Sequence, residues 1–154
     1  MDSRVAITAF ALSLGLGAQG ALVAQPAPAS APAPAPVRIE QPWIRSLPAG
    51  VPAAGYARLE NLSDRLIVLT AAASPAFGEV ELHRTVAQAG TMSMVPAARI
   101  EIAPHAALEF ASGGYHMMLM HPTHELHRGE RVPITLQFAS GARVTALFEV
   151  RDHE

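Results

Sequence analysis

The chain has 154 residues, half of them hydrophobic, a length typical of one folded domain. Its formal net charge is -2 and arginine supplies all 11 basic residues, so the charge favours neither nucleic acid nor an anionic membrane surface as a partner. The lack of cysteine excludes disulfides, zinc–thiolate and iron–sulfur sites, a lipid-modified cysteine, a cysteine nucleophile and a blue-copper electron-transfer site.

Residues 1–24 have the pattern of an export signal peptide. Arg4 precedes an apolar run over residues 5–16, and small residues allow cleavage after Ala24. An uncleaved anchor is the alternative, because residues 5–24 are long enough to cross a bilayer. In both cases the rest of the chain lies outside the cytoplasm. We therefore expect a periplasmic protein whose mature domain has no stable membrane insertion.

Alanine and proline dominate residues 25–37. Proline at every second position favours an extended, solvated segment, which predicts a linker or tail. The folded domain is then expected over residues 38–154.

The domain has the apolar period of two that is typical of β-strands. Turn residues separate the short strands, and a convincing hairpin surrounds Ser140-Gly141. No long helical stripe occurs. The pattern predicts an all-β domain, an antiparallel β-sandwich or barrel. The expected strands cover residues 56–61, 65–70, 79–85, 99–102, 107–110, 115–120, 133–138 and 143–150.

Methionine and histidine are concentrated in one part of the chain. Five of the six methionines lie within residues 92–120, and five of the seven histidines lie within residues 105–127. Taken singly, each is more often a core methionine or a solvated histidine. Met92 and Met94, however, share one face of an extended chain.

The segment around His116 adds to this pattern. Strand alternation puts His116, Met118 and Met120 on one face and turns Met117 toward the core. Thioether sulfur is soft and neutral, binds calcium or magnesium poorly and suits copper(I), and imidazole also binds copper. Two imidazoles and two thioethers therefore suit one copper(I) ion.

Charge limits where such a site can lie. Four neutral ligands leave the positive charge of copper(I) uncompensated, and burying that charge deeply is unfavourable. We therefore expect a shallow site suited to a carrier, unless nearby Glu81 supplies the compensating charge.

The sequence also resembles a known family. The pattern His83-x10-Met94-x21-His116-x-Met118 is similar to the H-x10-M-x21-H-x-M signature of the periplasmic copper chaperones called PCu(A)C. The likeness covers roughly residues 38–150. The stretches most similar to the family are residues 43–45, 54–56, 80–83, 92–94, 113–120 and 131–136.

The resemblance implies a cupredoxin-like β fold and one copper(I) held by His83, Met94, His116 and Met118. It further implies delivery toward cytochrome c oxidase assembly, to an oxidase subunit or a thioredoxin-like copper assembly protein. Auxiliary ligand candidates are Met92 and Met120.

The loop of residues 121–127 departs from the family pattern because it carries His121, His124 and His127. It predicts either a weak copper(II) site or, more simply, a solvated polar loop. Some family members have a His/Met-rich C-terminal tail. This sequence ends at Glu154 without one, so one principal site is expected.

The alternatives to a copper chaperone differ in how they would use the proposed site. A copper scavenger or storage protein would use the same site without a delivery partner. An enzyme is not expected, because the sequence has no nucleophile elbow, phosphate loop or HExxH motif. A structural or adhesion β-sandwich would bind no metal.

Overall fold

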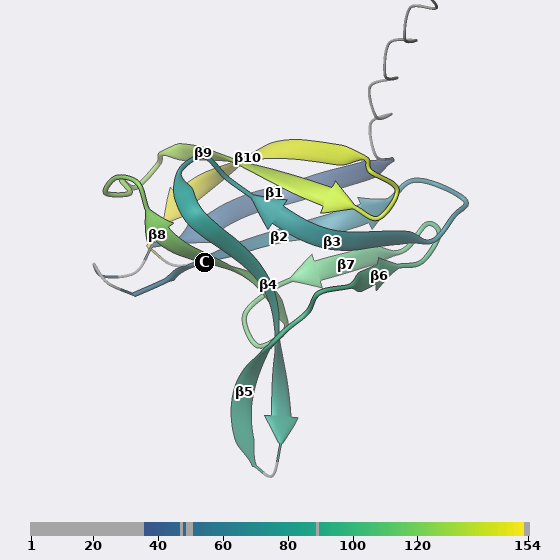
Figure 1. Ribbon diagram of the computed structural model, residues 1–154, viewed down its shortest axis with the longest axis horizontal. Coiled ribbons are helices and arrows are strands. Elements are labelled where there is room, and N and C mark those ends of the chain that lie inside the picture. Colours follow the sequence, from purple (N-terminus) through teal and green to yellow (C-terminus); the bar gives the residue numbers. More distant parts are fainter. Residues whose placement is uncertain (1–35, 47, 49–50, 89, 153–154) are drawn as a thin grey trace, which may run out of the picture. The chain divides into compact units, whose positions relative to one another are not determined.

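The computed structural model describes residues 36–46, 48, 51–88 and 90–152, and the described residues form ten strands and no helix. All ten belong to one hydrogen-bonded sheet in the order β5-β4-β8-β7-β2-β1-β10-β9-β3-β6 (Figure 1). The all-β class is therefore confirmed. The strands are β1 (Val37–Arg45), β2 (Ala53–Asn61), β3 (Ile67–Ala73), β4 (Phe77–Gln88), β5 (Thr91–Pro96), β6 (Ile100–Ile102), β7 (Ala107–Phe110), β8 (Tyr115–Pro122), β9 (Arg131–Phe138) and β10 (Arg143–Arg151).

Most neighbouring strands are antiparallel, as expected, but β1 and β10 pair in parallel, with Trp43 opposite Glu149. β7 and β8 also pair in parallel, at Phe110 and Tyr115. In neither parallel pair does a tight hairpin join the two strands. The sheet also curves back on itself, since β3 contacts β4 although the two are far apart in the strand order.

All eight strands predicted from the period-two pattern are present, and the structure has two more, β1 and β5, which that pattern did not predict. In β1 the alternation is interrupted by Gln41, which has a φ of 47°, and by a register shift between Glu40 and Trp43. Such a bulge hides the period-two pattern of a strand.

One hydrophobic core fills the space inside the curved sheet. Its residues come from every strand except β5, and their burial in a single cluster holds the fold together. The most deeply buried members include Ile44, Leu59, Leu69, Met117, Leu119, Ile134, Leu136 and Phe148.

A smaller cluster lies apart from this core and consists of Trp43, Ala54 and Tyr56. The rings of Trp43 and Tyr56 have centroids 4.7 Å apart. This cluster comes from β1 and β2, and because β2 pairs with β8, it borders the site described below.

The predicted signal peptide at residues 1–24 and nearly all of the predicted linker at residues 25–37 lie outside the described residues. Within the described part, no helix is long and apolar enough to span a membrane.

Candidate metal centre

Strands β4 and β8 bring the predicted histidines together. The two strands are antiparallel neighbours, and their register places His83 directly opposite His116 and Glu81 directly opposite Met118. Directly paired residues point to the same face of a sheet, and so do alternate residues along one strand. His83, His116, Glu81 and Met118 therefore share one face, opposite to the core face that holds Met117.

Hydrogen bonds fix the tautomer of both rings. His83 donates from Nε2 to Oε2 of Glu81 at 2.7 Å, and His116 donates from Nδ1 to the carbonyl oxygen of Gly114 at 3.2 Å. Each neutral ring then carries its free lone pair on the other nitrogen. Those two atoms, Nδ1 of His83 and Nε2 of His116, are buried and have no hydrogen-bond partner.

Unpartnered buried nitrogens are unfavourable in a protein interior unless something binds them. Histidines that bind a metal commonly donate their other N–H to a carboxylate or a backbone carbonyl, which is the arrangement of His83 with Glu81 and of His116 with Gly114. The donor set thus fits a metal ion held between the two rings.

The separation of the rings agrees with a shared ion. The ring centroids of His83 and His116 are 5.9 Å apart, with the ring planes inclined by 60°. Imidazole nitrogen binds metals such as zinc at about 2.0–2.1 Å, which puts the ion about 3.2 Å from each centroid and limits the centroid separation to about 6.4 Å. The observed distance lies within that limit.

Strand β5 adds thioethers to the same face. Its register with β4 pairs Met94 with Thr85 and Pro96 with His83. Met94 is therefore a diagonal neighbour of His83, within the reach of a long side chain. Met92 follows on the same face, one step further from His83.

Burial differs among the residues that were expected to form a shallow site. His83 and His116 are only 9% and 5% exposed, whereas Met94 is 62% exposed. The rings can be buried because Glu81 and Gly114 accept their N–H groups. The carboxylate of Glu81 also places a negative charge beside the rings.

Arg45 is a neighbour of the site that the sequence pattern does not predict. Arg45 on β1 pairs with Ala54 on β2, and Ala54 pairs with Met118 on β8. Its guanidinium lies 5.6 Å from the ring centroid of Tyr56, and its Nε is buried without a hydrogen-bond partner. Only the strand order, which puts β1 two strands from β8, reveals this proximity.

Two of the loop histidines contact Glu130. His124 bonds through Nε2 to Oε1 of Glu130 at 2.6 Å, and the backbone N–H of His127 donates to the other oxygen of Glu130 at 3.0 Å. Among the described residues, no three of His, Cys, Asp and Glu are close enough to hold a metal ion. The contacts of His124 and His127 with Glu130 are typical of a polar loop, the simpler of the two expectations.

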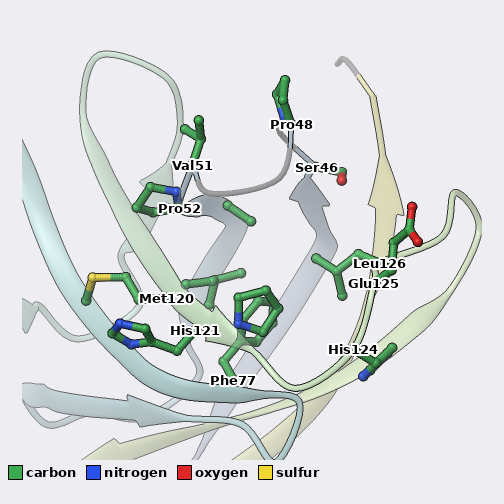
Figure 2. A pocket seen from close by; sticks show the side chains of 13 residues that line it. Ser46, Pro48, Val51, Pro52, Phe77, Met120, His121, His124, Glu125 and Leu126 are labelled. Atoms are coloured by element: carbon green, nitrogen blue, oxygen red, sulfur yellow. The ribbon is translucent and has the colours of Figure 1, made fainter.

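Met120 lies apart from the two buried rings. It lines a pocket of about 730 Å³ at the other end of β8, together with Phe77, His121 and His124. Figure 2 shows His121 and His124 on opposite sides of this pocket. Met120 therefore lines the pocket, whereas Met92 lies on the hairpin formed by β4 and β5.

Comparison with known proteins identifies the family. The family model described as "Putative lipoprotein LpqE-like" matches residues 37–150. The chain belongs to the LpqE-like family. A relative from Leifsonia xyli subsp. xyli (strain CTCB07), named "Putative lipoprotein Lxx21020", is 30% identical over 148 residues, which are 96% of this chain and 89% of the relative.

This LpqE-like protein is also similar to solved PCuAC domains. The copper-bound PCuAC domain from PmoF2 is 27% identical and has a TM-score of 0.64, with 77% of this chain and 95% of that domain covered. The copper(I) form of DR1885 from Deinococcus radiodurans is 29% identical and has a TM-score of 0.59, with 78% of this chain and 81% of that protein covered. These matches support the family resemblance predicted from the sequence.

The word lipoprotein in both names indicates that members of the LpqE-like family are secreted or envelope proteins. The 154 residues of this member contain no cysteine through which a lipid could be attached.

Stability of this LpqE-like protein is expected to depend on pH through His116. Burial lowers the pKa of His116, His83 and Arg45 lower it further, and the hydrogen bond to Gly114 opposes them. As the pH falls below about 6.5, the unfolded chain takes up a proton at this position before the folded protein does. Folding stability should therefore decrease as the pH falls from about 6.5 toward the lower native pKa.

Urea unfolding of the metal-free protein, followed between about pH 7 and pH 5, measures this effect. His116→Gln removes the titrating ring, so its stability should vary less with pH than that of the wild type. Equal slopes for the two proteins would contradict the lowered pKa.

Proposed function

We propose that this protein is a periplasmic copper(I) chaperone that binds one ion through His83, Met94, His116 and Met118. The observation that carries the proposal is the pair of buried, unpartnered nitrogens on His83 and His116, which face the same side as the thioether of Met118. Copper(I) is the cargo of this site. The proposed function of the protein is to bind this ion and pass it to another protein.

The choice of copper(I) rests on the ligand types. A site made of two imidazoles and two thioethers has no oxygen ligand of the kind that calcium, magnesium or manganese prefers, and no thiolate of the kind that structural zinc sites use. The similarity to a copper-bound PCuAC domain and to the copper(I) form of DR1885 supports the same choice.

Transfer, in preference to permanent retention, is supported by the graded exposure of the ligands. Met94 is open to solvent while the rings are buried, so a partner can approach the ion from the Met94 side. Neutral ligands also release copper(I) by stepwise exchange. The acceptor we propose is a cytochrome c oxidase subunit or a thioredoxin-like copper assembly protein. We propose no catalytic step, because four protein ligands leave no open position on the copper ion for a substrate.

The experiment that tests the function is an anaerobic titration of the purified domain with copper(I), followed by X-ray absorption of the bound ion. We expect one equivalent to bind with nitrogen and sulfur ligands in equal number. A structural or adhesion domain would bind no stoichiometric copper. Incubation of the loaded protein with the metal-free oxidase copper domain then separates a chaperone from a storage protein, which would keep its ion.

Glu81 is expected to act as a positioning residue for this cargo, since it holds His83 in the tautomer with a free Nδ1. Glu81→Ala should lower copper(I) affinity by about 10–100-fold, the usual effect of losing such a partner. Glu81→Gln keeps a hydrogen-bond acceptor and should retain more of the affinity than the alanine variant. Competition with a copper(I) chelator measures both, and equal losses would show that the charge alone matters.

A further inference from the structure

The hairpin of β4 and β5 differs from the rest of the sheet. It projects away from the other strands (Figure 1), and β5 stands at one end of the strand order, so one of its edges has no strand partner among the described residues. Residues 85–96, which make up most of the hairpin, include no charged side chain. Edge strands usually carry charged or otherwise protective residues, because an apolar open edge promotes association.

Two methionines stand on this hairpin without a packing role. Met92 and Met94 are each 62% exposed. Their partners on β4 are Ala87 and Thr85, whose small side chains offer little surface to cover a methionine. Neither methionine is among the residues that pack against the core. Hydrophobic burial therefore does not explain why methionine occupies either position.

The two side chains form a row that leads to the buried rings. Alternate residues of a strand share a face and lie about 7 Å apart. Along β5, Pro96 is opposite His83, Met94 comes next, and Met92 is the last residue of the row before the turn. A methionine side chain has three rotatable bonds, so its sulfur can move between neighbouring positions in such a row.

We propose that Met92 is an outer copper(I) ligand, through which the ion enters and leaves the inner site by way of Met94. This inference rests on the proposed copper(I) function. In the exchange, a copper–sulfur bond to Met92 forms as a copper–nitrogen bond to one of the rings breaks, while Met94 stays bound. No electron is transferred, so the copper remains in the +1 state.

The exposure of the two sulfurs fits this role. A thioether that is open to solvent can bind an incoming ion before the ion has lost all its other ligands, and a charge-free hairpin does not repel a cationic cargo. Met92 would bind copper(I) while the ion moves between this protein and a donor or acceptor protein that has soft ligands.

The test compares Met92→Leu with Met120→Leu in the full chain. Both changes nearly conserve volume and remove one thioether, but Met120 belongs to the pocket at the far end of β8. Each protein is loaded with one equivalent of copper(I). Bicinchoninate, a chromogenic copper(I) chelator, then removes the ion while the rate is followed by stopped-flow absorbance, and the equilibrium affinity is measured separately by competition.

We expect Met92→Leu to slow copper removal by about tenfold while the affinity stays within about twofold of the wild type, and Met120→Leu to change neither. Equal removal rates for Met92→Leu and the wild type would overturn the outer ligand. So would a loss of affinity as large as that of Met94→Leu, since Met92 would then belong to the inner set. Failure of the wild type to bind copper(I) would instead refute the proposed function itself.

Discussion

Met117→Ala is expected to destabilise the fold by about 2–5 kcal/mol, because the substitution leaves a cavity in the core. Met117 is 0% exposed, and its neighbour across the strands is Leu82, another core residue. Chemical unfolding of the metal-free protein measures the loss. Copper(I) affinity of the folded fraction should change little, since Met117 points away from the two rings.

Met118→Ala should have the reverse effect. Met118 is half-buried on the face of His116 and pairs with Glu81, so its removal takes a thioether from the proposed site but little volume from the core. Copper(I) affinity should fall far more than in Met117→Ala, and the free energy of unfolding should fall less. If Met117→Ala lost the copper and Met118→Ala lost the stability, the assignment of the two faces of β8 would be wrong.

His83→Gln is expected to lower copper(I) affinity by more than the roughly 10–100-fold that is typical of losing a supporting partner, because it removes a ligand nitrogen. His83 also provides the ring that faces His116 at 5.9 Å, so the remaining imidazole would lose its counterpart. Chelator competition measures the affinity, and X-ray absorption should report one nitrogen fewer around the ion.

His124→Gln is the matched control for this substitution. It removes an imidazole of the same chemistry from the loop, where His124 is bonded to Glu130. Copper(I) affinity should stay close to that of the wild type. An equal loss in both variants would mean that the ion is bound by dispersed histidines and not by the pair on β4 and β8.

The sequence predicted the strands well where each one keeps its alternation. The hairpin around Ser140-Gly141 appears as β9 and β10, with Val144 opposite Leu136. Strand β1 escaped prediction because Gln41 and the adjacent register shift interrupt its pattern. Its parallel pairing with β10 depends on contacts between distant parts of the chain, which local periodicity does not encode.

For the candidate site, alternation predicted that Met117 faces the core and that His116 and Met118 face the other way, and the burial of Met117 agrees. Alternation alone did not reveal that His83 lies opposite His116, because that requires the register of β4 against β8. It also did not reveal Arg45, whose proximity depends on the order of β1, β2 and β8.

The pairing of β4 with β8 has a consequence for insertions and deletions. Since His83 and His116 are held opposite each other by strand register, length changes in the connections between β5 and β8 should leave the pair intact. A single-residue deletion within either strand would instead turn one ring to the opposite side of the sheet. Homologues with altered loop lengths are therefore expected to keep both ligands, and variants with a shifted strand are expected to lose them.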